Sequence, residues 1–166
     1  MIFSMLVVSN TSPIANLAAI GRLGLLREQF HSLLCPAEVW RELLAHPDST
    51  ARAEIEQARR DGWLVVSEEA SSQEEWSGRL DPGEAKALAL AVHKKADLIL
   101  LDESAARRVA RELSLAHTGV LGILLCARRS GRISSLAEEI RRLREASGFF
   151  VGSVLEHELL RAAGEV

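Results

Sequence analysis

Acidic and amide side chains occur where this 166-residue chain leaves short apolar runs. Asn10 and Asp102 each follow such a run directly, and Glu42 and Glu84 lie on segments with helical patterning. Carboxylates gathered in one place repel one another unless a hard divalent cation is bound, and Mg²⁺ or Mn²⁺ takes oxygen ligands. The chemistry that such a set could perform is metal-assisted hydrolysis of a phosphodiester bond.

Each acid also has a structural interpretation. Glu42 could be an exposed helical glutamate, and Glu84 could complement a helix dipole. Asp81 is expected to be the N-cap of its helix, although it is also an alternative metal ligand three residues before Glu84. Asp102 could cap the helix that follows it, but a carboxylate at the mouth of a buried strand is often functional. The residues alone leave these alternatives open.

The elements that must position these side chains alternate along the chain. Apolar runs predict strands at Met5–Ser9, Leu33–Cys35, Trp63–Val66, Leu98–Leu101 and Leu115–His117. Helical spacing predicts helices at 14–20, 23–30, 37–45, 51–60, 82–93, 104–113, 120–129, 135–146 and 151–163. Ser67–Arg79 is acidic and serine-rich and is expected to be a surface excursion. Repeated βα units predict an α/β fold with a parallel sheet of about five strands, and ligands lie outside the carboxyl ends of such strands.

Length and composition are those of an ordinary globular domain. The chain has 20 basic and 23 acidic residues, a net charge of -3 and 48% hydrophobic residues. One core is expected, so residues 1–166 are predicted to form a single domain with a helical segment docked at 131–166. No apolar stretch approaches the roughly 20 residues that span a bilayer, and Met1–Val8 lacks the features of a signal peptide. We expect a cytoplasmic protein with Cys35 and Cys126 buried.

Several common sites are absent from the sequence. It has no GxGxxG, GxxxxGK[ST] or GxSxG motif, so dinucleotide, P-loop and hydrolase-elbow chemistry are poorly supported. The five histidines are scattered without an i, i+4 pair, which argues against a zinc site. Between Ser104 and Arg144 nine arginines face three glutamates; they could hold phosphates or simply form solvated helix faces.

Five segments in order resemble the PIN-domain superfamily, in particular its prokaryotic branch of unknown-function proteins related to toxin ribonucleases. They are Val8-Ser-Asn-Thr-Ser-Pro-Ile, the helix from Pro36 to Glu42, Leu80-Asp-Pro-Gly-Glu-Ala, Leu100-Leu-Asp-Glu with Ala106-Arg, and Thr118-Gly-Val-Leu-Gly-Ile-Leu. The resemblance runs from about Leu6 to Arg129. It implies a three-layer α/β/α fold of Rossmann-like type, three or four acids that bind Mg²⁺ or Mn²⁺, and cleavage of RNA by an activated water.

The resemblance assigns roles to individual residues. The second, third and fourth acids of the family fall on Glu42, Glu84 and Asp102, which are the expected catalytic residues and metal ligands. The first acid, usually an aspartate, falls on Asn10. This is a departure, because an amide oxygen can ligate a cation but contributes no charge.

Neighbouring residues of the same motifs are candidates for substrate binding. Thr11 and Ser12 match the small hydroxyl residues beside the first acid, and helix N-capping before Pro13 is their structural alternative. Arg107 matches an arginine expected to touch substrate phosphate, and it could instead pair with Glu103 across one helical turn.

Two functions of different classes follow. The first is a metal-dependent ribonuclease that cleaves single-stranded RNA, as the toxin of a toxin–antitoxin pair. The alternative is a catalytically weak or inactive RNA-binding or regulatory module, and a small-molecule binder is a weaker third. The resemblance also implies a small antitoxin and a homodimer as partners. A C-terminal apolar stripe is expected to pack on its own domain, and self-association through this stripe or the helix Val120–Arg129 is the alternative. The stripe consists of Val151, Val154, Leu155, Leu159 and Ala162.

Overall fold

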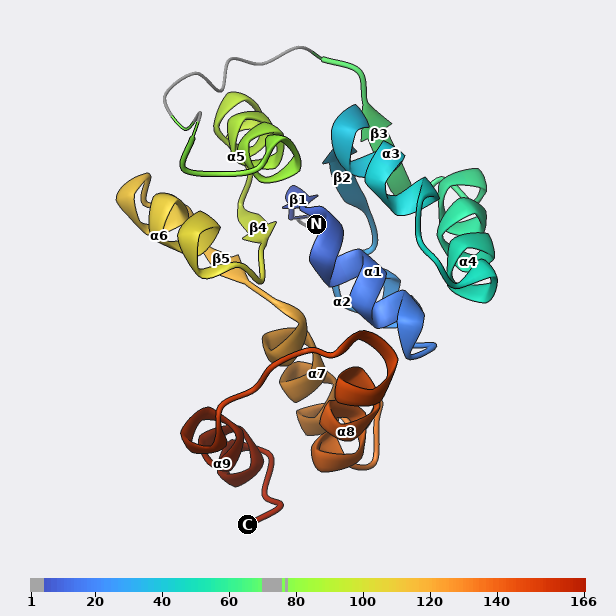
Figure 1. Cartoon of the computed structure of the whole chain (residues 1–166), viewed down its shortest axis with the longest axis vertical. Coiled ribbons are helices and arrows are strands. Elements are labelled where there is room, and N and C mark those ends of the chain that lie inside the picture. Colours follow the sequence, from blue (N-terminus) through green and yellow to red (C-terminus); the bar gives the residue numbers. More distant parts are fainter. Residues whose placement is uncertain (1–4, 70–75, 77) are drawn as a thin grey trace, which may run out of the picture.

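A five-stranded parallel sheet organises the molecule (Figure 1). The structure, a computed structural model, describes residues 5–69, 76 and 78–166. The strands are β1 (Val7–Ser9), β2 (Leu33–Pro36), β3 (Leu64–Ser67), β4 (Leu98–Leu100) and β5 (His117–Thr118), in the order β3-β2-β1-β4-β5. All four strand pairings are parallel, which confirms the predicted α/β class.

Helices connect the strands and cover both faces of the sheet (Figure 1). In the described residues they are α1 (Thr11–Ala19), α2 (Gly24–Phe30), α3 (Ala37–Leu44), α4 (Ser49–Arg60), α5 (Pro82–Lys94), α6 (Ser104–Glu112), α7 (Val120–Arg129), α8 (Leu136–Ser147) and α9 (Ser153–Ala162). Pro36 is the N-cap of α3, directly before the predicted start of this helix at residue 37. The predicted order of elements is the observed one.

The two faces of the sheet carry separate apolar clusters. Val7 packs into a cluster with residues of α1 to α4, α7 and α8, whereas its neighbour Val8 packs with α5 and α6. Successive side chains of a strand point to opposite faces, so an uninterrupted apolar strand can fill both clusters at once. The result is a three-layer α/β/α arrangement with β1 at its centre.

Two predicted details of the middle of the chain differ from the structure. The fifth strand begins at His117, because its register pairs Ile99 with His117 and Leu100 with Thr118, and Leu115 packs against the α5–α6 cluster instead. Of the expected excursion, residues 70–75 and 77 lie outside the described residues. Trp76 is buried in the α5–α6 cluster.

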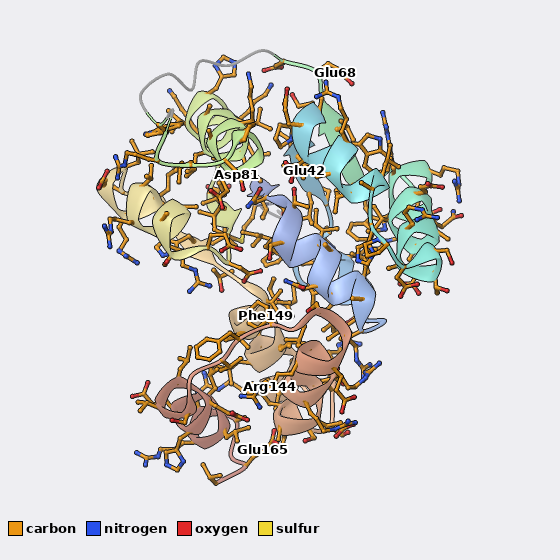
Figure 2. All side chains as sticks on the ribbon, in the orientation of Figure 1. Glu42, Glu68, Asp81, Arg144, Phe149 and Glu165 are labelled. Atoms are coloured by element: carbon orange, nitrogen blue, oxygen red, sulfur yellow. The ribbon has the colours of Figure 1, made fainter. Side chains whose placement is uncertain are left out.

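The C-terminal helices pack below the sheet (Figure 1). Helix α8 contacts α1 and α7, and Glu165 closes the segment by accepting the backbone N–H groups of Leu136 and Ala137 at the start of α8 (Figure 2). Two of the five members of the expected apolar stripe pack on their own domain. Val151 is buried and Leu159 packs on the core, but the other three, Val154, Leu155 and Ala162, are exposed.

Leu160 and Ala163 take their place against the core. Helix α9 is therefore rotated relative to the predicted stripe.

Both cysteines were expected to be buried, and this was half right: Cys35 is buried, which raises the pKa of its thiol to about 12, and Cys126 is exposed. In the part of the chain that the structure describes, every helix is too short or too polar to cross a membrane.

Candidate active site at the carboxyl edge of the sheet

The carboxyl ends of the strands gather the candidate residues. β1 has β2 on one side and β4 on the other, so the chain crosses over in opposite directions from this strand. In open α/β sheets ligands bind in the crevice at such a switch point. Asn10 leaves β1, α3 with Glu42 follows β2, and Asp102 follows β4. Figure 2 shows Glu42 and Asp81 at the same end of the molecule.

Asn10 is the most unusual polar residue of this edge. It is the N-cap of α1, and its backbone N–H donates to the carbonyl oxygen of Leu100 on β4 at 3.1 Å. Its side chain makes no capping bond, although the residue is only 4% exposed. Its Oδ1 is the one buried side-chain N or O atom, among the described residues, without a hydrogen-bond partner. Buried polar atoms in proteins are normally paired, so this oxygen requires an explanation.

Glu42 reaches the site from α3. The hydroxyl of Thr11 donates to Glu42 Oε2, which ties this exposed glutamate to the first turn of α1. On its other side the carboxylate lies against Gly83, where an added Cβ would sit 2.5 Å from Glu42 Oε1. Gly83 therefore leaves the space that lets Glu42 approach the first turn of α5. Gly83 directly precedes Glu84 in the sequence.

Glu84 is held by a capping box at the start of α5. Its backbone N–H donates to Asp81 Oδ1 at 2.8 Å, and its own Oε2 accepts the backbone N–H of Asp81 at 3.2 Å. Glu84 is 6% exposed. Burial raises the pKa of its carboxyl, and the acidic side chains of Asp81 and Glu103 raise it further against the opposing effect of the Asp81 N–H. Asp81 is confirmed as the N-cap and is exposed.

Asp102 is held from several directions. Its side chain is 3% exposed. Ser12 Oγ donates to Oδ2 at 3.0 Å, the Val120 N–H donates to Oδ1 at 2.9 Å, and Arg107 Nη2 lies 3.8 Å from Oδ1. Burial nevertheless raises the pKa of this carboxyl, because the cost of desolvation exceeds what the Val120 N–H, Ser12, Arg107 and Asn16 supply.

Asp102 caps the start of α7. The structural alternative, that it caps α6, the helix directly after it in the sequence, is wrong. Helix α6 has Glu103 at its N-cap without a side-chain capping bond, whereas Val120 is the first residue of α7. The close approach depends on Gly119, where an added Cβ would lie 2.3 Å from Asp102 Oδ1 and 2.8 Å from the Leu101 carbonyl oxygen.

The structural alternatives for the neighbouring residues are also wrong. Thr11 and Ser12 do not cap α1, since Asn10 holds the N-cap position and both hydroxyls donate to carboxylates. Arg107 pairs with Asp102 and donates its Nε–H to the Leu101 carbonyl oxygen at 3.0 Å. Within the described residues no ion pair joins it to Glu103.

The contacts bring the predicted residues together in three groups. Thr11 contacts Glu42, Asp81 contacts Glu84, and Asp102 contacts both Ser12 and Arg107. Asn10 directly precedes the two hydroxyl residues. No three His, Cys, Asp or Glu side chains of the described chain lie close enough together to hold a metal ion. A shared cation would therefore need the amide oxygen of Asn10 as well as acids from more than one group.

Three residues that sequence reasoning missed take part in this edge. Gly83 and Gly119 leave room for the carboxylates, and Asn16 donates its Nδ2–H to Ser12 Oγ at 2.9 Å. Both glycines lie at helix starts inside the motifs that were singled out, and Asn16 is one helical turn after Ser12. Those positions were the only available signals, because the partners lie far away in the sequence.

Comparison with families of known proteins identifies a matching family. The sequence profile of the family DUF3368, described as a PIN domain, matches residues 6–165. No curated protein matches the chain.

Proposed function

Because the chain belongs to the PIN-domain family, we propose that it is a metal-dependent endoribonuclease that hydrolyses the phosphodiester bonds of single-stranded RNA. The observation that carries this proposal is the buried, unpartnered Oδ1 of Asn10. Leaving such an acceptor unpaired costs about 1–3 kcal/mol, and a hard cation would satisfy it. Acids linked to the next two residues, Glu42 through Thr11 and Asp102 through Ser12, supply negative charge.

We propose that Asn10, Glu42, Glu84 and Asp102 are the ligands of one or two ions of Mg²⁺ or Mn²⁺, and a single ion would have to draw the three acids closer together than they lie here. Their oxygens are the donors that these ions prefer. When bound, a divalent cation polarises the phosphoryl oxygen and lowers the pKa of water. Asp81 is the weaker ligand, since its Oδ1 already accepts the Glu84 N–H.

The chain's own residues hold the acids in place. The hydroxyls of Thr11 and Ser12 orient Glu42 and Asp102, and the start of α7 orients Asp102 through its first N–H. Arg107 keeps its side chain 35% exposed while its Nε–H is fixed on the Leu101 carbonyl. Its outer guanidinium nitrogens are therefore the groups that we propose contact a substrate phosphate.

A second candidate is a PIN module that binds RNA with weak or no catalysis. The observation that favours it is Asn10 itself, because the residue contributes an oxygen and no charge to a site for a divalent cation. Metal affinity would then be low, and binding of RNA would not require the ion.

The deciding experiment is cleavage of single-stranded RNA by the purified protein in Mn²⁺, in Mg²⁺ and in EDTA, with Asp102→Asn as the control. The nuclease proposal expects cleavage that EDTA and Asp102→Asn both abolish. RNA binding without cleavage would support the second candidate. Activity that is equal in EDTA would contradict the metal-dependent proposal.

A toxin role is the finer form of the proposal. If RNA cleavage arrests growth, expression of the wild-type chain should be toxic and expression of Asp102→Asn should not. The small antitoxin implied for such a toxin would have to cover the carboxyl edge of the sheet, so its addition should inhibit cleavage in the purified system. Toxicity that is the same in both forms would contradict this role.

We also propose a homodimer formed through the exposed apolar side chains around α9. Phe150, Val154 and Leu155 are 87%, 74% and 45% exposed, and burial of such a surface in a second copy would remove it from water. Light scattering at several concentrations should give about twice 18.2 kDa for the wild type and about 18.2 kDa for Leu155→Glu with its fold intact. A wild-type mass near 18.2 kDa throughout would contradict the dimer.

A further inference from the structure

Asn16 contacts the candidate site from α1 through Ser12. It lies on α1 one turn after Ser12, and both side chains are partly buried. Its Nδ2 donates to Ser12 Oγ at 2.9 Å, and Ser12 Oγ donates to Asp102 Oδ2 at 3.0 Å. A relay of two hydrogen bonds therefore runs from Asn16 through Ser12 to Asp102, and the Asn16 amide also helps directly to lower the pKa of that carboxyl.

The chemistry of the three groups fixes the direction of this relay. An amide nitrogen has only hydrogens to give, and an ionised carboxylate can only accept. The hydroxyl of Ser12 has a single hydrogen and must accept from Asn16, so that hydrogen is directed to Asp102. Without Asn16 the hydroxyl could rotate away and leave Oδ2 without its donor.

This restraint matters because it complements the one on the other oxygen. Oδ1 of Asp102 is fixed by the Val120 N–H at 2.9 Å, so Ser12 and Val120 together set the plane of the carboxylate. A carboxylate has about four lone-pair positions on its two oxygens; each of these bonds occupies one, and Arg107 Nη2 lies 3.8 Å from Oδ1. The remaining positions stay available for a cation, in an orientation that is already set.

We propose that Asn16 is a positioning residue of the metal site, which holds the Ser12 hydroxyl as a permanent donor to Asp102 and thereby sets the affinity of the site for a divalent cation. The inference rests on the proposed function in one respect, that Asp102 is a ligand. Outer partners of metal ligands typically contribute about 10- to 100-fold in metal affinity or activity.

A double-mutant cycle tests the proposal, with Mn²⁺ alone titrated calorimetrically into metal-free protein. Asn16→Ala and Ser12→Ala should each weaken Mn²⁺ binding about tenfold. The double variant should lose clearly less than the product of the two single losses, because Asn16 acts chiefly through the hydroxyl that is already gone. Gln29→Ala is the matched control: it removes an amide donor to the Ile123 carbonyl oxygen at 2.9 Å and should leave Mn²⁺ affinity unchanged.

Three outcomes would overturn the proposal. Unchanged Mn²⁺ affinity in Asn16→Ala would show that Asn16 does not position the site. Effects that multiply in the double variant would show that it acts independently of Ser12. Wild-type protein that binds no Mn²⁺ would overturn the metal site itself and so separates failure of the proposed function from failure of the relay. Thermal unfolding without metal identifies any variant whose loss of binding follows from loss of the fold.

Discussion

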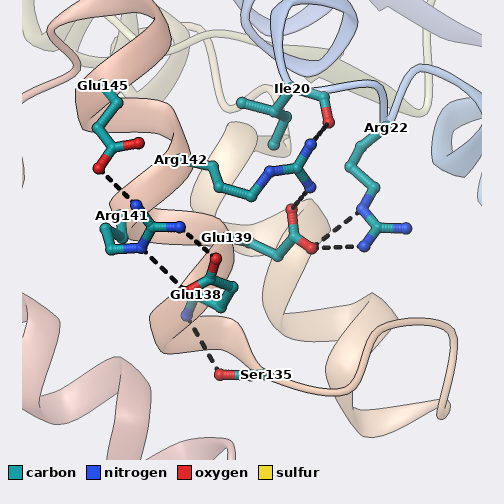
Figure 3. A network of polar contacts seen from close by, with 8 residues as sticks. All are labelled: Ile20, Arg22, Ser135, Glu138, Glu139, Arg141, Arg142 and Glu145. Atoms are coloured by element: carbon teal, nitrogen blue, oxygen red, sulfur yellow. Dashed lines mark hydrogen bonds and ion pairs between the residues drawn. The ribbon is translucent and has the colours of Figure 1, made fainter.

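Buried carboxylates occur in two regions of this protein and are treated differently in each. In the C-terminal helices Glu139 is 3% exposed and accepts from the guanidinium groups of Arg22 and Arg142, and Arg142 also donates to the Ile20 carbonyl oxygen (Figure 3). At the carboxyl edge of the sheet, burial raises the pKa of both Glu84 and Asp102. Their hydrogen-bond partners are chiefly backbone N–H groups and a hydroxyl, and Arg107 lies 3.8 Å from Asp102.

This contrast separates a structural acid from a functional one. A buried charge with two close guanidinium partners is compensated and serves to join α8 to the end of α1. Acids that are desolvated without comparable compensation make the folded state less stable and are a recognised feature of functional sites. Removing charge from the two regions should therefore have opposite consequences.

The largest effect is expected from Asp102→Asn. The amide keeps the shape of the side chain but has a single acceptor oxygen, so it keeps only one of the two bonds from Ser12 and Val120. It also removes the charge that a cation requires. We expect RNA cleavage to fall by more than about 100-fold, beyond what an outer partner typically contributes. The free energy of unfolding without metal should stay the same or rise, because a desolvated charge is gone. Cleavage kinetics and urea unfolding measure the two quantities.

A variant that retains most of its activity would show that Asp102 is not a ligand. A large loss of stability would show that the acid belongs to the structural class, and the contrast between the two regions would fail.

The next largest effect is expected from Glu139→Gln, which should lower the stability of the fold and leave RNA cleavage unchanged. Loss of the charge leaves Arg22 and Arg142 without their shared partner, and because both guanidinium groups are about one-third exposed, water screens part of the loss. We expect about 2 kcal/mol of destabilisation, which lowers Tm by roughly 4–8 °C in a chain of this length.

Glu138→Gln is the matched control on the same helix. Glu138 pairs with Arg141 at the surface, and its side chain is 51% exposed (Figure 3). Exposed pairs contribute little, so Tm should change by less than about 1 °C. Equal effects of the two substitutions would mean that burial does not distinguish Glu139, and a loss of cleavage at a temperature where Glu139→Gln is folded would connect this network to the site.

A smaller effect is expected from Asn10→Asp, which moves the site further toward uncompensated charge. The substitution replaces the amide, whose buried Oδ1 has no hydrogen-bond partner, by a carboxylate of nearly the same volume. Without metal the variant should be less stable than the wild type, and Mn²⁺ binding should be about tenfold tighter, equivalent to 1.4 kcal/mol. Calorimetric titration of both forms measures this. Equal or weaker affinity in the variant would remove Asn10 from the ligand set and make Asp81 the better candidate.

The sequence was sufficient for the architecture because each strand and helix carries its own signal. The apolar run Leu98–Leu101 could only be a buried strand next to helical segments, and Asp81 before Pro82 marked the start of α5. The rotation of α9 was not predictable in this way. Periodicity shows that a helix has an apolar side, but whether Leu155 or Leu160 meets the core depends on where the preceding chain places the helix.

The sequence predicted the acids of the candidate site but not the residues that hold them in place. Strand ends and motif order were enough to single out Asp102, but Ser12 and Val120 reach it from 90 and 18 residues away. The local sequence predicts that Ser12 is a helix N-cap, since a serine at the start of a helix usually accepts a backbone N–H of the first turn. Only the tertiary arrangement shows that Asp102 competes successfully for that hydroxyl.

The smallest expected effect is a pH dependence that distinguishes Asp102 from the compensated acids. Burial raises the pKa of Asp102 in the folded state, so between its unfolded and folded pKa values the folded protein binds more protons than the unfolded chain. The contribution of this group to stability therefore falls as pH rises through the folded pKa and improves on acidification. In EDTA, the stability difference between Asp102→Asn and wild type should be greatest at neutral pH and shrink as pH falls.

Glu165 is the contrasting case. Burial alone would raise the pKa of its carboxyl, but hydrogen bonds from the start of α8 lower it, so its contribution to stability is lost on acidification. Urea unfolding of wild type, Asp102→Asn and Glu165→Gln from neutral to acidic pH measures both trends, and a difference between Asp102→Asn and wild type that grows as pH falls would contradict a desolvated, uncompensated Asp102.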